Sequence, residues 1–119
     1  MVVDLLTPEA LSAPEADRVF KALADPTRRD ILARAIEREQ SVSALARRYE
    51  MSLTAVQKHV AVLERAALVS KEKRGREQRV SANPETLRKA STLLEAFEQL
   101  WIKRATTIAE ILAEEGTRT

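Results

Sequence analysis

The 119-residue chain lacks cysteine, and it has one histidine, two glycines, one tryptophan, one tyrosine and two phenylalanines. Without cysteine there are no disulfides, no thiolate metal sites and no thiol redox chemistry. One histidine leaves no common nucleophile–base pair, and the two glycines stand alone rather than in a phosphate-binding loop. We therefore expect neither enzymatic activity nor a cofactor.

Long apolar runs are also missing. No segment approaches the roughly 18 apolar residues that a membrane-spanning helix needs. The opening MVVDLLTPEALSAPEADR has no cationic start followed by an apolar block, so we expect no secretory signal and a cytoplasmic location. The length suits one domain, and the scarcity of glycine and aromatic residues predicts a mainly α fold.

What the chain does have is a helix-turn-helix pattern that begins after Ser41, a candidate N-cap. The first helix has an apolar stripe at helical spacing: Val42, Leu45, Ala46 and Tyr49. The turn Glu50-Met51-Ser52 leads to a second helix, which is expected to bury Val56, Val60, Leu63 and Ala67. The other side of this helix presents Thr54, Gln57, Lys58, Ala61 and Arg65. Small, amide and basic side chains suit a helix that enters the major groove of DNA.

Charge is concentrated in the same region. Residues 41–82 contain nine basic and four acidic side chains, a net charge of +5, although the whole chain carries only +2. Ordinary solvated helix faces are also rich in lysine and arginine, so charge alone does not decide the function. Charge combined with helix-turn-helix spacing favours DNA binding.

A basic β-hairpin is predicted directly after the second helix. Strands at about 69–73 and 78–82 flank the tip Arg74-Gly75-Arg76-Glu77, and Gly75 supplies the positive φ that a tight turn needs. The alternative is a plain surface hairpin. Because the hairpin follows a helix-turn-helix, we interpret it as the wing of a winged helix, with arginines that contact a minor groove or phosphates.

Cap signals divide the rest of the chain. Residues 1–11 are expected to be a flexible arm, and residues 12–115 the domain. Ser12, Asp25 and Asn83 each precede a proline-marked helix start. The helix after Asp25 is expected to bury Ile31, Leu32, Ala35 and Ile36. Its Arg28 and Arg29 either contact phosphate or pair with Asp25 and Asp30.

The last helix, from about Pro84 to Glu114, has more apolar surface than one small domain needs. Heptad rows contain Leu87, Leu94, Trp101 and Ile108, and Ala90, Phe97, Arg104 and Ile111. Packing on the chain's own first helix alone is the alternative. We predict instead that the helix pairs with a second copy about a two-fold axis. A dimer also suits pseudo-palindromic DNA.

Two segments resemble the signatures of the ArsR/SmtB family of bacterial winged-helix repressors. VFKALADPTRRDIL at 19–32 is similar to the family's opening, and SLTAVQKHVAVLERAALV at 52–69 to its reading helix, with Gln57 in place of the common serine and Ala67 in place of glycine. The resemblance covers nearly all of residues 14–115. It implies a fold of order α-α-α-α-β-β-α and a homodimeric, sequence-specific repressor of transcription that binds a pseudo-palindromic operator in double-stranded DNA.

The resemblance also implies the site residues. DNA contacts are implied for Ser52, Thr54, Gln57, Lys58, His59, Arg74, Arg76 and Arg79. Arg65 is added because it lies on the exposed side of the same helix. His59 is alternatively structural. The dimer interface is expected to be formed by the first helix and the last (84–115), through Val19, Phe20, Leu94, Phe97, Trp101, Ile108 and Ile111.

Metal sensing, for which the family is best known, is not expected here. The positions of the family's cysteine pairs contain no thiol, and the last helix has glutamates but no histidine, whereas zinc prefers thiolate and imidazole. Two alternatives to a metal-independent repressor are an effector- or protein-gated regulator with a ligand site near Trp101 or Phe97, and a protein-interaction module. The basic wing argues against the module.

Overall fold

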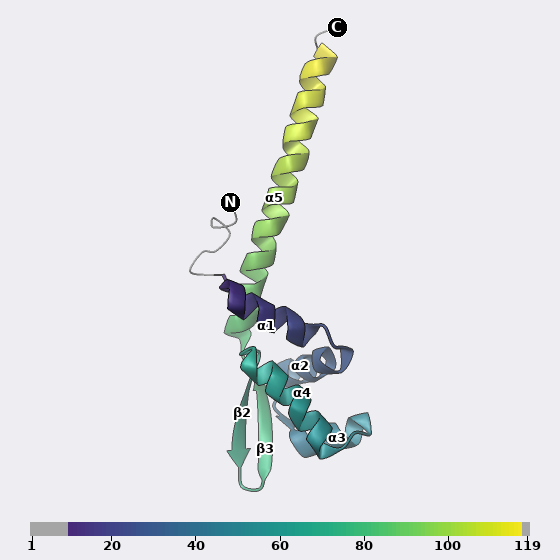
Figure 1. The fold of residues 1–119 in the computed structure, drawn as a ribbon, viewed down its shortest axis with the longest axis vertical. Coiled ribbons are helices and arrows are strands. Elements are labelled where there is room, and N and C mark those ends of the chain that lie inside the picture. The colour runs from purple at the N-terminus through teal and green to yellow at the C-terminus, as the bar shows by residue number, and fades with distance from the viewer. Residues whose placement is uncertain (1–9, 118–119) are drawn as a thin grey trace.

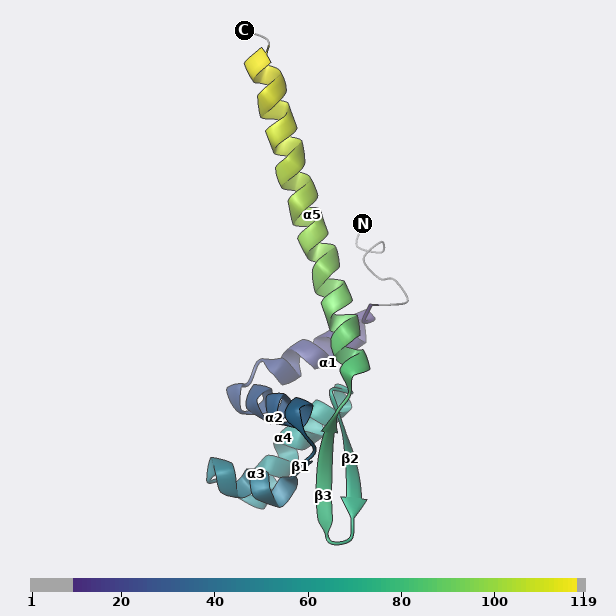
Figure 2. The same cartoon turned by 180° about the vertical axis from the view of Figure 1, so that it is seen from behind.

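The computed structural model describes residues 10–117, and Figures 1 and 2 show a helical body from which one long helix projects. The elements are α1 (Ala13–Leu23), α2 (Pro26–Glu37), β1 (Gln40–Ser41), α3 (Val42–Tyr49), α4 (Leu53–Arg65), β2 (Val69–Arg74), β3 (Glu77–Ala82) and α5 (Pro84–Thr117). The mainly α winged-helix order predicted from the sequence is confirmed, with β1 as an additional strand.

Side-chain caps start the four shorter helices, as predicted. The capping oxygen accepts a backbone N–H three residues on in each case: Ser12 from Glu15 at 3.3 Å, Asp25 from Arg28 at 3.0 Å, Ser41 from Ala44 at 3.3 Å and Ser52 from Ala55 at 3.1 Å. Each bond satisfies a donor that the first turn of a helix leaves unpaired.

Asn83 does something different from the predicted cap. Its side-chain oxygen accepts from the Ser70 hydroxyl at 2.9 Å, and its amide donates to the Ala67 carbonyl at 3.0 Å. The residue therefore links the end of α4 to the sheet just before α5 begins.

The sheet has three antiparallel strands in the order β1-β3-β2, rather than the two of a simple hairpin. β1 pairs Gln40 with Val80 and Ser41 with Arg79. A two-residue strand has no periodicity of its own, so its pairing arises from tertiary contact. The β2–β3 turn consists of Gly75 and Arg76, and the φ of +61° at Gly75, the first central residue, fits a type II′ turn.

The core lies where α1, α2, α3 and α4 meet the inner face of the wing, and it includes Val19, Ile31, Leu45, Leu63 and Val80.

Three of the burial predictions made from the sequence are wrong. Leu11, expected in the flexible arm, is buried in this core with 1% exposure; residues 1–9 lie outside the described residues. Ile36 is 55% exposed, because it lies on the side of α2 turned away from the core. Ala67 is exposed and follows the end of α4 with φ +59°, while its neighbour Ala66 is buried.

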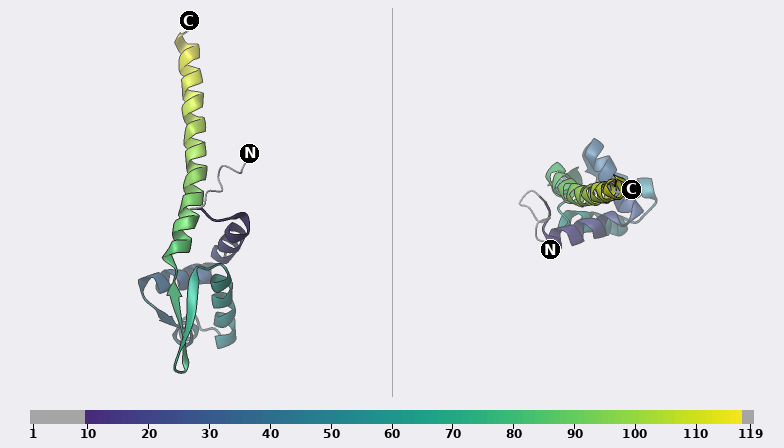
Figure 3. Two further views of the ribbon diagram at one scale, coloured as in Figure 1. Left: turned by 90° about the vertical axis from the view of Figure 1, so that its left-hand side faces the viewer. Right: turned by 90° about the horizontal axis from the view of Figure 1, so that it is seen from above.

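The projecting α5 makes the subunit elongated, and its free end lies opposite the wing tip (Figure 3). The extents are 76 × 29 × 20 Å, and the radius of gyration is 20.3 Å, against about 13.5 Å for a compact chain of this length. Only the first turns of α5, with Ala90 and Leu93, are buried against the body. Within residues 10–117, no helix combines the length and apolarity needed to cross a membrane.

Candidate nucleic-acid interface

The reading helix α4 is held in place by one apolar side. Val56, Val60 and Leu63 are fully buried, so the polar side of the helix faces solvent. Thr54, Gln57 and Lys58 are exposed there, as the sequence predicted. Ser52 serves as the N-cap, so its hydroxyl is already an acceptor for the helix itself. The helix begins after a turn in which Glu50 adopts a left-handed conformation with φ +53°.

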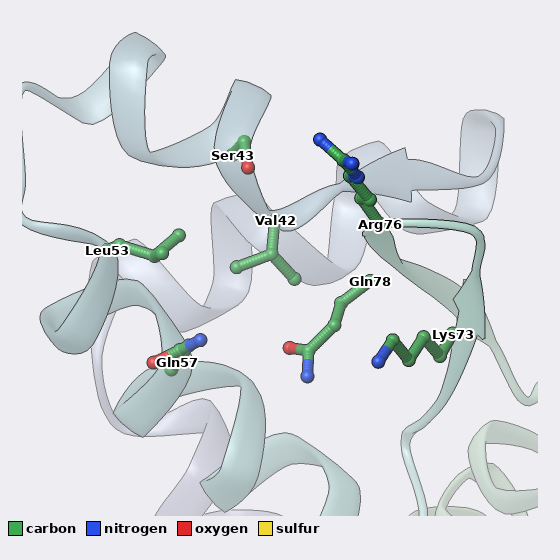
Figure 4. A pocket seen from close by; sticks show the side chains of 7 residues that line it. All are labelled: Val42, Ser43, Leu53, Gln57, Lys73, Arg76 and Gln78. Carbon is green, nitrogen blue, oxygen red and sulfur yellow. The ribbon is translucent and has the colours of Figure 1, made fainter.

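A hollow separates the start of α4 from the wing, and Figure 4 shows the side chains that surround it. Its volume is about 250 Å³, and its lining comes from α3, α4, β2, β3 and the wing turn: Val42, Ser43, Leu53, Gln57, Lys73, Arg76 and Gln78. Gln57 of the reading helix and Arg76 of the wing, two residues predicted to contact DNA, therefore share one concave surface. No carboxylate lines it.

The wing has two chemically different faces. The cross-strand pairs Lys71–Val80 and Lys73–Gln78 share one side, and because Val80 is buried, this side faces the helical body. The pairs Glu72–Arg79 and Arg74–Glu77 occupy the other side. Alternation along each strand thus separates residues that are adjacent in sequence.

The two arginines on the outer face are paired with acids. Arg74 donates to Glu39 at 3.0 Å and lies 3.7 Å from Glu72. Arg79 Nε approaches Glu77 at 3.4 Å and Glu39 at 3.7 Å, within ion-pair distance but without hydrogen-bond geometry. Both were predicted to bind DNA. In the free subunit their charge is instead largely balanced by three glutamates, on the face of the wing turned away from the reading helix.

The surroundings of His59 fit the structural role that the sequence analysis gave as the alternative to a DNA contact. Its Nδ1 lies 3.4 Å from an Arg28 guanidinium nitrogen and 3.9 Å from the Asp25 carboxylate, and the side chain is mostly covered. The imidazole is therefore part of the corner between α1 and α2 rather than of the solvent-facing surface of α4. The Arg28 backbone N–H, which bonds to the carboxylate, lowers the pKa of Asp25.

Among the described residues, the guanidinium groups of Arg28 and Arg29 form no ion pair with Asp25 or Asp30. Arg28 donates from Nε to the Ala22 carbonyl at 2.8 Å and from its terminal nitrogen to Lys21 at 3.1 Å. Arg29 donates to the Leu23 carbonyl at 2.7 Å. Both cations thus satisfy carbonyls at the C-terminus of α1, where the helix dipole favours positive charge.

Arg65 lies at the far end of α4, about 18 Å from Leu53 by helical rise. Together with Arg18 and Lys21 of α1 and Val62, it surrounds a small separate hollow of about 110 Å³. This basic cluster does not include the wing, so the structure does not bring Arg65 together with Gln57 and Arg76.

Three polar residues of the main hollow were not among the predicted DNA contacts: Ser43, Lys73 and Gln78. A signal for two of them was available. Lys73 lies on the same side of its strand as Lys71, and Gln78 lies on the same side of its strand as Val80. Because Val80 is buried, this side faces the body. Ser43 carried no such signal, because its position depends on how α3 packs beside the wing.

The predicted dimer residues fall into two groups. Phe20, Leu94, Phe97, Trp101, Ile108 and Ile111 are exposed by 41–69% in the single subunit. Val19 has no exposed surface, because it packs in the subunit's own core, so its assignment to an interface is corrected.

Comparison with known proteins identifies the family to which this chain belongs. Residues 23–72 match a family model described as a helix-turn-helix domain. The chain is 35% identical over 103 residues, 87% of its length, to 94% of the HTH-type transcriptional regulator Rv2034 of Mycobacterium tuberculosis. The ArsR-like transcriptional regulator from Rhodococcus sp. RHA1 superposes with a TM-score of 0.73 at 38% identity, covering 82% of this chain and 92% of that one. This chain is an ArsR-family winged helix-turn-helix regulator.

A third structure has the same fold at lower identity. The homodimeric winged helix-turn-helix DNA-binding domain of a possible ArsR-family regulator from Mycobacterium bovis aligns with 77% of this chain at a TM-score of 0.55 and 24% identity. As an ArsR-family member, the protein is a DNA-binding transcriptional regulator and not an enzyme.

Proposed function

We propose that this ArsR-family regulator is a homodimeric, metal-independent repressor that binds a pseudo-palindromic operator in the cytoplasm. The observation that carries the proposal is the shared concave surface of Gln57 and Arg76. It lets a helix in the major groove and a wing beside it act on one stretch of duplex. Thr54 and Lys58 extend the same exposed face of α4.

The roles of these side chains follow from their chemistry. A glutamine amide pairs with the N6 and N7 edge of adenine, so Gln57 is the proposed base reader. Arg76 and Lys58 neutralise phosphates without reading sequence. Residues 12–115 form the DNA-binding and dimerising unit in this proposal.

Dimerisation is supported by the apolar face of α5. Large apolar side chains along about five turns of α5 are exposed by 47–69% in the single subunit: Leu94, Phe97, Leu100, Trp101, Ile108, Ile111 and Leu112. Such a surface is rare on a monomer. A second copy is the partner that would also present two reading helices to half-sites about one helical turn apart.

Metal independence is supported by the donor set. The chain has no cysteine, and the one imidazole already lies between Asp25 and Arg28. Within residues 10–117, no group of three potential ligands is clustered. Zinc, nickel and arsenite should each leave the melting temperature unchanged, and tight stoichiometric zinc binding would contradict the proposal.

Effector gating remains the alternative. A hollow of about 220 Å³ lies beside Trp101, Arg104, Ala105 and Ile108 on α5. Since one helix supplies the whole lining, the partner subunit is its expected occupant, and a small molecule that releases DNA would favour the gated reading.

The proposal is tested by letting the purified protein select duplexes from a random pool. Enrichment of a sequence with dyad symmetry, and a block of transcription in vitro when that sequence lies within a promoter, are expected. Gln57→Ala should reduce discrimination against the wrong base by about 1–3 kcal/mol, whereas Arg76→Ala should weaken all sequences alike. Equal effects of both variants on random DNA would contradict these roles.

A further inference from the structure

The hollow between α4 and the wing is lined mainly by hydrogen-bond donors, together with two apolar side chains. Ser43 contributes a hydroxyl, Gln57 and Gln78 contribute amides, and Lys73 and Arg76 contribute cations. Val42 and Leu53 form the apolar part (Figure 4). With two cations and no carboxylate in its lining, the hollow is electrostatically favourable for an anion.

The cations at this hollow differ from their neighbours in the wing. Lys71 lies 3.8 Å from Glu64, while Arg74 and Arg79 are paired with Glu39, Glu72 and Glu77. Lys73 and Arg76, in contrast, have no ion-pair partner among the described residues. The wing thus neutralises its outer face internally and leaves two charges toward the reading helix.

The side-chain amide of Gln78 is a second feature that distinguishes this hollow. Its side-chain oxygen is buried and has no hydrogen-bond partner. Nothing described in the structure holds this amide in one orientation, so it can turn and direct its NH₂ group to an acceptor. An unpaired buried polar group is unfavourable, and a ligand that fills the hollow would relieve it.

We propose that the hollow seats one phosphodiester group of the DNA backbone. Ser43 and Gln78 donate hydrogen bonds to its oxygens, Lys73 and Arg76 balance its charge, and exposed Leu53 packs on the adjoining deoxyribose. The inference rests on the proposed function, and it assigns phosphate binding to Ser43, Lys73 and Gln78. It also explains the location, since a strand that separates a helix in the major groove from a wing must pass between them.

The first experiment measures duplex affinity against salt. The probe is a duplex selected from a random pool by the wild-type protein. Lys73→Met should reduce the slope of log affinity against log salt by about 1.8, because the homodimer loses one phosphate contact in each half-site and each contact contributes about 0.9. The matched control is Arg74→Met, one residue away on the outer face, which should leave the slope unchanged. Unchanged melting temperatures verify that both variants fold.

The second experiment identifies the contacted linkage. Single neutral methylphosphonate linkages are placed along the selected duplex. Wild type should lose affinity at one linkage in each half-site, and Lys73→Met, Ser43→Ala and Gln78→Leu should each lose sensitivity at that same linkage only. If all three variants respond to every linkage as wild type does, the inference is wrong.

Two other outcomes also decide the matter. If inorganic phosphate shifts the Gln78 side-chain amide resonances while no linkage couples to Lys73, the hollow binds a free anion and the backbone assignment is overturned. If the wild-type protein enriches no sequence from the pool, the proposed function fails, whatever the hollow does. A selected duplex without coupling instead contradicts the further inference alone.

Discussion

At the residue scale, Asp30 shows how one carboxylate joins two helices. It accepts hydrogen bonds from the Tyr49 hydroxyl of α3 and, at 2.8 Å, from Arg34 Nε one turn further along α2. The Tyr49 bond, followed by that of Arg34, lowers the pKa of Asp30 and outweighs the opposing effect of burial. The same carboxylate and, above all, burial raise the pKa of Tyr49, so the phenol stays a donor.

The lowered pKa makes a prediction about acid stability. Because the folded protein favours the ionised Asp30, its contribution is complete above the unfolded pKa, about 3.9, and is lost as the pH falls through the lower folded value. Asp30→Asn should reduce the free energy of unfolding at pH 7 by about 1 kcal/mol, and by less at pH 3. Urea denaturation at both values measures this, with exposed Asp17→Asn as the control. An equal loss at both pH values would contradict the assignment.

A second residue-scale prediction concerns Ala67. The left-handed conformation at φ +59° costs an L-residue roughly 1–2 kcal/mol, and glycine escapes this cost but loses more entropy on folding. Ala67→Gly should therefore stabilise the protein by about 0.5–1 kcal/mol. The neighbouring Ala66 has φ −80°, so Ala66→Gly should destabilise it. Thermal unfolding distinguishes the two, and a loss in both would contradict the strain argument.

At the scale of the elements, the proposed DNA interface depends on α4 and the wing together. The apolar side of α4 fixes which residues face outward, and strand alternation in the wing decides which cations meet them. The wing arginines illustrate the difference: Arg76 in the turn reaches the shared hollow, whereas Arg74 and Arg79 are paired with glutamates.

The cap of α4 gives the prediction at this scale. Ser52 accepts the Ala55 N–H, so Ser52→Ala should reduce stability by about 1 kcal/mol. Ser52→Asn keeps a capping oxygen and should restore most of that stability. If the asparagine variant is as unstable as the alanine variant, the cap is not what Ser52 contributes.

At the scale of the whole molecule, charge and apolar surface are separated along the long axis. The basic stretch at 41–82, which includes the wing, lies toward one end, and the exposed apolar face of α5 extends toward the other (Figure 1). The large radius of gyration follows from an α5 that leaves the body after Leu93. Such a shape is expected of half an assembly.

The corresponding prediction concerns Trp101, which is 69% exposed in the single subunit. If a second copy buries it, Trp101→Ala should weaken dimerisation by about 3–5 kcal/mol, as measured by analytical ultracentrifugation. Lys103→Ala, at an outer heptad position, is the control. A Trp101→Ala variant that remains dimeric at micromolar concentration with unchanged melting would place the interface elsewhere.

The sequence by itself determined whatever depends on local chemistry. Serine and aspartate caps, the 3.6-residue apolar spacing of α1 to α5, and Gly75 in the turn all act over a few residues, so they could be recognised without the fold. The tertiary structure alone decided which polar groups meet. Arg74 and Arg79 pair with Glu39, and His59 lies against Arg28 at the α1–α2 corner. Ser43, Gln57 and Gln78, which belong to separate elements, line one hollow. Such pairings join residues distant in sequence, and no local pattern encodes them.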